Sequence, residues 1–375
     1  MVAPVSIPAI DPTQISFNKA PVLRYSSRGT PYTRWVSFGM PQLGQYSYLL
    51  DVPVFLYRNA DDARAGVDSG GTGFFVSVQS KTRRDKCYVY VVTNWHVVCP
   101  NGCSTIRVNC KNGEPDIFEH DPAEWFFLPK FHDIAVIPIR LDGNKHQAAA
   151  LNGETYIVTP DYVEAEKIGP GDDVFMIGRF IDYDGVEVNR PAMRFGNISI
   201  IDAPVKQLTG YSGQSIVVDM HSRTGHSGSP VFVYRTAGSL FAEKGQWVTG
   251  HTMKLLGIHW GQFPELWELK EGVKEPESEA ALITEGKYVK GLSGMTCVCP
   301  AWAILEVLNM PRLREIRERN DRQLEKQPGA LPAEGEVTIS NGELPTKDEN
   351  PRHREDFSRL LDAAAKGPKP SPGKA

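Results

Sequence analysis

The stretch CYVYVVTNWHVV (residues 87–98) decides the fold class. Its β-branched and aromatic residues are typical of a buried β-strand, and a histidine, His96, follows that strand directly. Further short apolar runs, bounded by turn residues, lie at 49–57, 71–78, 126–140, 174–180, 192–201, 214–220, 230–235 and 254–260. Many short strands with few helical patterns predict an all-β protein, built as a barrel or a sandwich.

Helical patterns appear only near the end of the chain. Residues 300–309 begin with a proline and place apolar side chains on one face, which predicts a helix. Residues 311–327 are highly charged, so we expect a second helix that is solvated. Beyond about residue 328, low hydrophobicity with many prolines, glycines and charges predicts disorder, interrupted by a short amphipathic helix at 357–365. The segment before the first strand, 1–48, is predicted to be an extended arm.

The overall composition excludes several classes of function. Hydrophobic residues make up 41% of the 375, which suits a globular protein with a core. The formal charge is −4, from 41 Lys+Arg and 45 Asp+Glu, without the basic excess of a nucleic-acid binder. No stretch reaches the roughly 18 apolar residues that span a bilayer. We therefore expect neither nucleic acid nor a membrane as a partner.

The first residues lack the basic and apolar regions of a secretory signal. We therefore predict a cytoplasmic location, with a removed leader outside this sequence as the alternative. In the cytoplasm the six cysteines are expected to be reduced and mostly buried. They are Cys87, Cys99, Cys103, Cys110, Cys297 and Cys299. The spacing from Cys99 to Cys110 leaves zinc as an alternative, but it lacks a paired C-x2-C arrangement. We expect no metal and no cofactor.

Three short motifs follow one another in a chemically meaningful order. TNWHVV (93–98) places His96 after a strand, HDIAV (132–136) places Asp133 before one, and GHSGSP (225–230) places Ser227 in a glycine-rich turn. Each motif alone is common, because a histidine or an aspartate beside a strand is usually structural. Together, in the order His, Asp, Ser, they predict a catalytic triad and differ from the Ser, Asp, His order of α/β-hydrolases.

The chemistry of acyl transfer explains why these residue types belong together. A serine hydroxyl is a weak nucleophile until a neutral imidazole removes its proton, so Ser227 needs His96 as a general base. A carboxylate, here Asp133, holds the imidazole in the correct tautomer. The oxyanion of the tetrahedral intermediate needs two backbone N–H donors, and the turn predicts those of Gly225 and Ser227.

On these motifs the chain resembles the trypsin/chymotrypsin-like peptidase family in its bacterial form. The patterns T-x-x-H-V, D-I-A-V and G-x-S-G-S-P are shared, as is the strand Gly71-Thr72-Gly73-Phe74, and the resemblance covers about residues 50–310. It implies serine endopeptidase activity and two six-stranded antiparallel barrels followed by a helix. We accordingly expect a peptidase domain at 49–310, with barrels at about 49–160 and 161–300 and a helix at 300–309, and then a charged helix and disordered tail at 311–375.

Two features of the sequence depart from that family. Trypsin-like zymogens usually carry an aspartate just before the serine, whereas this chain has His226. Activation through a newly freed N-terminus is therefore not expected. Secreted relatives often have a disulfide beside the histidine, and here only Cys99 lies close enough in sequence to contribute to one.

The string GIHWG (257–261) bears on specificity. After G-x-S-G-S-P it resembles the bacterial glutamyl endopeptidases, and the resemblance implies that His259 contacts an acidic substrate side chain with help from Ser222. Trp260 and Gly261 complete the expected pocket wall, whose backbone pairs with the substrate. An imidazole and a hydroxyl are suitable donors to a carboxylate. The alternative is that His259 packs in the core, facing away from the site.

Two other functions remain open from the sequence. One is a non-catalytic binding protein on the same fold, although such members generally lose triad residues and this chain keeps all three. The other is a protease that stays latent until a partner binds. A regulatory protein partner would then engage the N-terminal arm or the C-terminal tail, while a protein or peptide would be the substrate.

Overall fold

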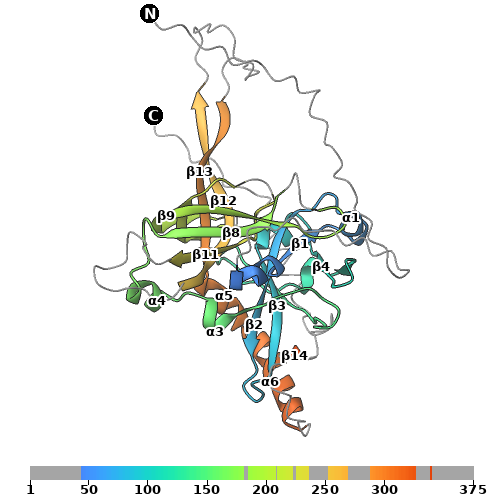
Figure 1. Ribbon diagram of the computed structural model, residues 1–375. Helices are drawn as coiled ribbons and strands as arrows, with labels where there is room; N and C mark the ends of the chain where they lie inside the picture. Colours follow the sequence, from blue (N-terminus) through green and yellow to red (C-terminus); the bar gives the residue numbers. More distant parts are fainter. Residues whose placement is uncertain are drawn as a thin grey trace, which may run out of the picture. The chain divides into compact units, whose positions relative to one another are not determined.

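Two curled β-sheets and few helices carry the fold, as predicted (Figure 1). The computed structural model describes residues 44–180, 185–207, 209–222, 225–235, 252–268, 288–326 and 338–339. All of them belong to one unit, Gly44–Ala375. Most of the expected arm, the segment 236–251 and the expected helix at 357–365 lie outside the described residues. None of the described helices is long and apolar enough to cross a membrane.

The elements follow in this order along the chain. The strands are β1 (Pro53–Tyr57), β2 (Gly71–Gln79), β3 (Lys86–Thr93), β4 (Thr105–Asn109), β5 (Pro115–Phe118), β6 (Ala135–Pro138), β7 (Leu151–Asn152), β8 (Asp173–Arg179), β9 (Pro191–Lys206), β10 (Ser212–Asp219), β11 (Pro230–Arg235), β12 (Thr252–Glu268), β13 (Tyr288–Pro300) and β14 (Thr338–Ile339). The helices are α1 (Ala60–Ala65), α2 (Trp95–Val98), α3 (Gly153–Tyr156), α4 (Pro160–Ala165), α5 (Trp302–Leu308) and α6 (Pro311–Lys326), with 3-10 helices η2 (Gly44–Asp51) and η3 (Pro122–Glu124).

The first sheet is built from the N-terminal half of the domain. Its strand order is β14-β3-β2-β1-β4-β5, with β6 paired to β3 and β7 to β2. The central pairs are antiparallel, while the two-residue strands β7 and β14 pair in parallel. This sheet therefore has eight strands, where the family resemblance implied six.

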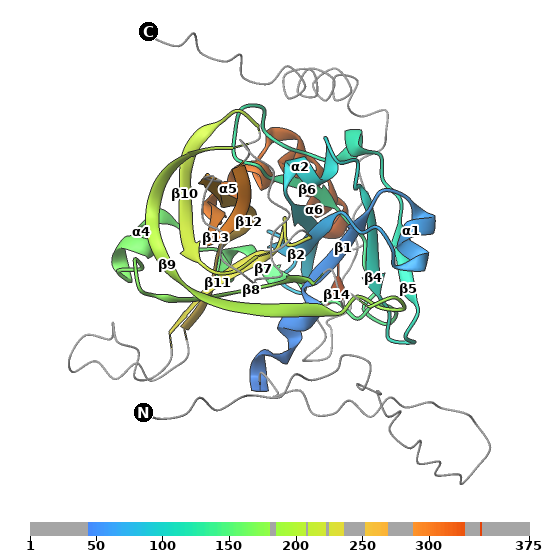
Figure 2. The ribbon, with the colours of Figure 1, turned by 90° about the horizontal axis from the view of Figure 1, so that it is seen from above.

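The second sheet closes into a six-stranded barrel in the order β10-β13-β12-β11-β8-β9, with antiparallel pairing throughout. Figure 2 shows the barrel curling beside the first sheet. Strands β12 and β13 are long, and their ribbon extends beyond the barrel (Figure 1). Strand β13 was not predicted, because its glycines and short apolar runs obscure the alternation of apolar and polar residues.

One apolar core joins the two sheets. Phe74 and Val92 of the first sheet belong to the same buried cluster as Val174 and Ile258 of the barrel. Because this shared core leaves the sheets packed against each other, residues carried by different sheets can meet at their junction.

Two elements differ from expectation in the N-terminal half. Residues 49–51, predicted as strand, complete the 3-10 helix η2, and the strand starts only at Pro53. Of the predicted strand at 126–140, only Ala135–Pro138 is strand. Pro129 and the charged residues in 126–133 keep that part irregular, since proline cannot donate a hydrogen bond to a neighbouring strand.

The prediction that the helix at 311–327 is solvated is wrong. Helix α6 spans Pro311–Lys326, but it buries Leu313 and Asp321 against the first sheet. The Asp321 carboxylate accepts hydrogen bonds from Tyr88 Oη (2.7 Å) and Ser80 Oγ (2.6 Å). Arg317 donates to Tyr90 Oη at 3.0 Å. Paired polar groups allow a helix this charged to be buried on one side.

Candidate active site

Strand pairing brings the predicted base and acid together. Thr93, the last residue of β3, pairs with Ala135, the first residue of β6. The antiparallel register therefore places the residues just after β3 beside those just before β6. His96 follows on the short helix α2, and Asp133 precedes β6.

Two hydrogen bonds fasten His96 to Asp133. The ring Nδ1 lies 2.5 Å from Oδ2 of the carboxylate, and the backbone N–H of His96 donates to Oδ1 at 2.9 Å. Asp133 is fully buried and His96 is 8% exposed. A buried carboxylate at Nδ1 favours the tautomer in which Nδ1 carries the proton and Nε2 is the bare nitrogen.

The backbone of Asp133 is held from both directions. Its carbonyl accepts from Asn94 Nδ2 at 2.7 Å, and its N–H donates to Gln207 Oε1 at 2.7 Å. The Gln207 amide nitrogen also lies 2.9 Å from His132 Nδ1, which can only accept from it. Gln207 comes from the second half of the chain, after β9, and nothing in its local sequence indicates this role.

Ser227 lies in a turn that needs glycine on both sides. Gly225 and Gly228 have φ of +95° and +87°, a region that disfavours side chains. A Cβ at Gly228 would lie 1.8 Å from the carbonyl oxygen of Thr72. The glycines predicted for this turn are therefore required by its backbone and by the close approach of β2.

Thr72 fixes the turn from the first sheet. Its N–H donates to the carbonyl of Ser227 at 2.8 Å, and its Oγ1 donates to the carbonyl of Gly225 at 2.9 Å. Thr72 is fully buried, and its Oγ1 also accepts from the N–H of Arg179 at 3.0 Å. The sequence marked Thr72 only as part of a shared strand, so its contact with the serine turn is a finding of the structure.

The N–H groups of Gly225 and Ser227 donate no backbone hydrogen bond within the described residues. Their role as oxyanion donors stays a prediction. Ser227 is half-buried, and no hydrogen bond links its Oγ to His96 among the described residues. Such contacts are often long in the absence of substrate and shorten in the reacting complex.

Of the four residues predicted to form the specificity pocket, Ser222 and His259 are in contact. Ser222 Oγ lies 2.8 Å from His259 Nε2, and both residues are buried. Burial lowers the pKa of His259 to about 3, so this ring is neutral at pH 7. Trp260 is half-buried beside the core. Gly261 faces open space, since a Cβ there would meet no atom within 4 Å.

Sequence reasoning missed two further residues that contact Ser222. Thr296 Oγ1, from β13, lies 3.0 Å from Ser222 Oγ, and the Gln262 amide nitrogen donates to the same oxygen. Pairing of β12 with β13 places Gln262 opposite Thr296, which explains why both side chains reach Ser222. Because β13 was not predicted, neither residue could be placed.

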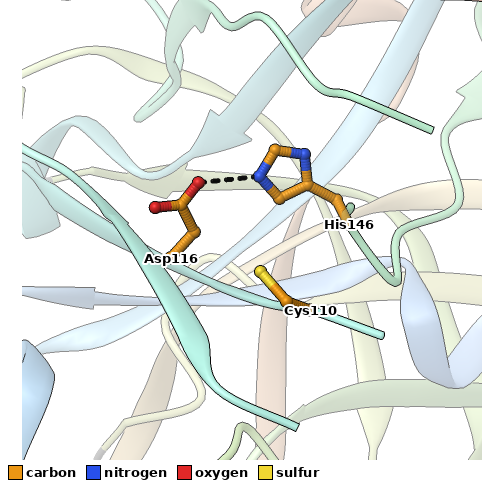
Figure 3. A group of neighbouring side chains, drawn as sticks. All are labelled: Cys110, Asp116 and His146. Atoms are coloured by element: carbon orange, nitrogen blue, oxygen red, sulfur yellow. Dashed lines mark hydrogen bonds and ion pairs between the residues drawn. The ribbon is translucent and has the colours of Figure 1, made fainter. Parts of the chain in front are cut away.

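A separate group of polar side chains lies beside strands β4 and β5 of the first sheet. It consists of Cys110, Asp116 and His146 (Figure 3). Their potential ligand atoms lie within 4.8 Å of one another, the spacing of a metal site. A cavity of about 190 Å³ borders His146. Cys110 was also one of the three cysteines for which zinc was an alternative.

The protonation of His146 does not fit a metal ligand. Its Nδ1 accepts from the N–H of Asp142 at 2.8 Å, so Nε2 carries the proton and donates to Asp116 at 2.9 Å. A metal-bound histidine places its bare nitrogen on the ion, whereas the bare nitrogen of His146 is occupied by the Asp142 N–H. Lys145 Nζ also lies 2.5 Å from Asp116 Oδ2. Burial acts to raise the pKa of Asp116, but these hydrogen bonds outweigh it and lower that pKa. The group links β5 to the turn at 142–146.

All six cysteines are among the described residues, and each is a buried, free thiol, as expected. Burial raises the pKa of Cys297 to about 12 and that of Cys99 further still. Only a thiolate is a good nucleophile or a strong metal ligand. These thiols stay protonated at neutral pH and are therefore unreactive.

Comparison with known proteins gives one family match and several similar solved structures. Residues 71–242 match a family model described as a trypsin-like peptidase domain, a span that contains His96, Asp133 and Ser227. No curated protein matches the chain. Among solved structures, the chain is similar to the MamO protease domain of Magnetospirillum magneticum in its apo form, at 16% identity and a TM-score of 0.37 over 71% of this chain and all of that one. It is also similar to Rv3671c of M. tuberculosis H37Rv, an inactive serine-to-alanine mutant, at 15% identity and a TM-score of 0.35 over 75% of this chain and 96% of that one.

Proposed function

We propose that this chain is a serine endopeptidase with Ser227 as nucleophile, His96 as general base and Asp133 as the orienting acid. The proposal depends on one observation. His96 and Asp133 are joined by two hydrogen bonds on the first sheet, and the glycine-rich turn that contains Ser227 is hydrogen-bonded to that same sheet.

In the proposed mechanism, Ser227 Oγ attacks the scissile carbonyl while His96 Nε2 removes its proton. The resulting oxyanion accepts hydrogen bonds from the N–H groups of Gly225 and Ser227. His96 then gives the proton to the leaving amine, and an acyl-enzyme ester remains on Ser227. Water, activated by the same imidazole, hydrolyses the ester. Asp133 stabilises the imidazolium that forms in each half of the reaction.

We further propose a preference for an acidic residue, glutamate before aspartate, ahead of the scissile bond. The contact between Ser222 and His259 supports it, because three groups able to donate, counting Thr296, surround one point of the pocket. In the neutral ring only one nitrogen carries a proton, so His259 offers one donor to a carboxylate.

The test is cleavage of a proteome-derived peptide library, with Ser227→Ala as the control. We expect cleavage after Glu and a loss of turnover of at least about 10⁴-fold in the variant, with an unchanged fold by circular dichroism. A Lys/Arg or aromatic preference would refute the acidic pocket. Wild-type turnover in Ser227→Ala would refute the nucleophile.

Labelling with a fluorophosphonate probe separates the competing functions. An activated serine reacts with the probe whatever its peptide specificity, so the wild-type chain should be labelled at Ser227 and Ser227→Ala should not. Absence of labelling, with and without added partner proteins, would favour the non-catalytic binding protein.

A further inference from the structure

The hydroxyl of Ser222 is the meeting point of the pocket. It contacts His259 Nε2 at 2.8 Å and Thr296 Oγ1 at 3.0 Å, and it accepts from the amide nitrogen of Gln262. Ser222, His259 and Thr296 are all at most 3% exposed. Gln262 is only half-buried, so it enters this buried cluster from the open side.

The hydrogen-bonding capacity of Ser222 is used up by these partners. A hydroxyl has one proton to donate and two lone pairs. Gln262 fills one lone pair, and of the other two partners one receives the proton while the other fills the second lone pair. An incoming carboxylate only accepts hydrogen bonds, and it finds the Ser222 proton already donated to one of these partners. If Gln262 leaves, His259 Nε2–H and Thr296 Oγ1–H can both donate to Ser222, and the Ser222 proton becomes free for the carboxylate.

Gln262 is the partner best able to leave. It follows Gly261, where a Cβ would meet no atom within 4 Å, and the β12–β13 register shifts between Gln262 and Pro264. Its amide has the size and planar shape of a glutamate carboxylate, so it occupies the space that a substrate acid of the proposed type requires.

We propose that Gln262 is an internal occupant of the specificity pocket, and that a substrate's acidic side chain must displace it from Ser222. This inference rests on the proposed function, since it takes the cluster around Ser222 to be the substrate pocket. Gln262 thereby sets the affinity for the residue before the scissile bond. It leaves the chemistry at Ser227 unchanged.

Binding to the full chain carrying Ser227→Ala tests this without turnover. The probe is N-acetyl-Ala-Ala-Glu amide, with the corresponding all-alanine peptide as control, and dissociation constants are measured by NMR titration of ¹⁵N-labelled histidine. Adding Gln262→Ala should tighten binding of the Glu peptide about five-fold, the value of one ordinary hydrogen bond. Gln214→Ala, an exposed glutamine on β10, is the matched control and should change nothing.

Two more variants separate bulk from hydrogen bonding. Gln262→Met keeps the length but cannot donate, so its effect should fall between those of wild type and Gln262→Ala. Gln262→Glu places a carboxylate of the chain in the pocket and should weaken Glu-peptide binding at least ten-fold.

Unchanged or weaker binding in Gln262→Ala would overturn the proposal, because Gln262 would then be a bystander or a substrate contact. Absence of saturable Glu-peptide binding in every variant would overturn it together with the acidic preference. Fluorophosphonate labelling of the chain with Ser227 intact decides the endopeptidase assignment separately.

Discussion

The two halves of the proposed active site, the acid–base pair and the turn of the nucleophile, are held in different ways. On the first sheet, side chains hold His96 and Asp133, and the groups that contact them are buried and specific. In the turn of Ser227, backbone hydrogen bonds dominate: Thr72 N–H to Ser227 O at 2.8 Å, and Gly228 N–H to His259 O at 2.9 Å. The acid–base half therefore depends on which side chains are present, and the nucleophile half depends on where the backbone runs.

This difference predicts how the halves respond to mutation. Conservative substitutions in the acid–base half should lower kcat strongly, because they change the tautomer of His96 or remove the charge of Asp133. In the turn, the same kind of change should act only through the few side chains that touch the backbone.

The largest effect is expected from Asp133→Asn. The amide keeps the volume but presents a donor to His96 Nδ1, so the ring adopts the wrong tautomer and kcat should fall about 10⁴-fold. Steady-state kinetics on the best library peptide measures it. Asp116→Asn makes the same change in the distant group on β5 and should leave kcat unaltered. Equal losses in both variants would show that the effect is one of folding.

A smaller fall in kcat is expected from Thr72→Val, which tests whether the Thr72 hydroxyl positions the turn that contains Ser227. Valine keeps the shape of Thr72 but cannot donate to the Gly225 carbonyl, so the oxyanion donors lose part of their alignment. We expect kcat to fall about 10-fold to 100-fold with little change in KM. Thr72→Ser should restore most of it. Thr105→Val, a buried threonine on β4, controls for the general cost of the substitution. A change in KM alone would contradict a positioning role.

The smallest expected effect is on the free energy of unfolding, and it comes from His132, which lies where the two halves of the site join. Phe131 and Tyr211 pack edge-on against its ring, and Gln207 donates to Nδ1. Burial lowers the pKa of His132 from 6.5 to about 4. Between these values the unfolded chain binds more protons than the folded one, so the free energy of unfolding decreases as pH falls.

Between pH 6.5 and 5, the titration of His132 should lower the free energy of unfolding by about 2 kcal/mol. In His132→Asn, the side-chain oxygen can still accept from Gln207 but does not titrate. Urea denaturation at the two pH values should therefore show a smaller loss for the variant. Buried His259 contributes in the same direction in both proteins. An equal loss in wild type and variant would remove His132 as the cause.

The sequence alone was enough to predict those parts of the candidate site that are encoded by short stretches of consecutive residues. His96, Asp133 and the glycines around Ser227 each belong to a short motif, because a strand end or a tight turn imposes its own residue pattern. The all-β class followed from the same alternation of short apolar runs, and the fold confirms it.

What the sequence could not supply depends on long-range pairing. Gln207 meets Asp133 across 74 positions, and Thr72 meets Gly225 across 153. A glutamine or a threonine carries no local sign of such a partner. Helix α6 was misjudged for a related reason, since charged residues such as Arg317 and Asp321 are buried only because tyrosines of β3 receive them.

That docking of α6 has a consequence for the order in which the protein is made. Tyr88 and Asp321 are separated by 233 positions, so a ribosome synthesises β3 long before the helix that covers it. Until the last turn of α6 leaves the exit tunnel, a nascent chain presents one face of its first sheet uncovered. The N-terminal half of the domain can thus acquire its strands early but reaches its final packing only after α6 has been synthesised.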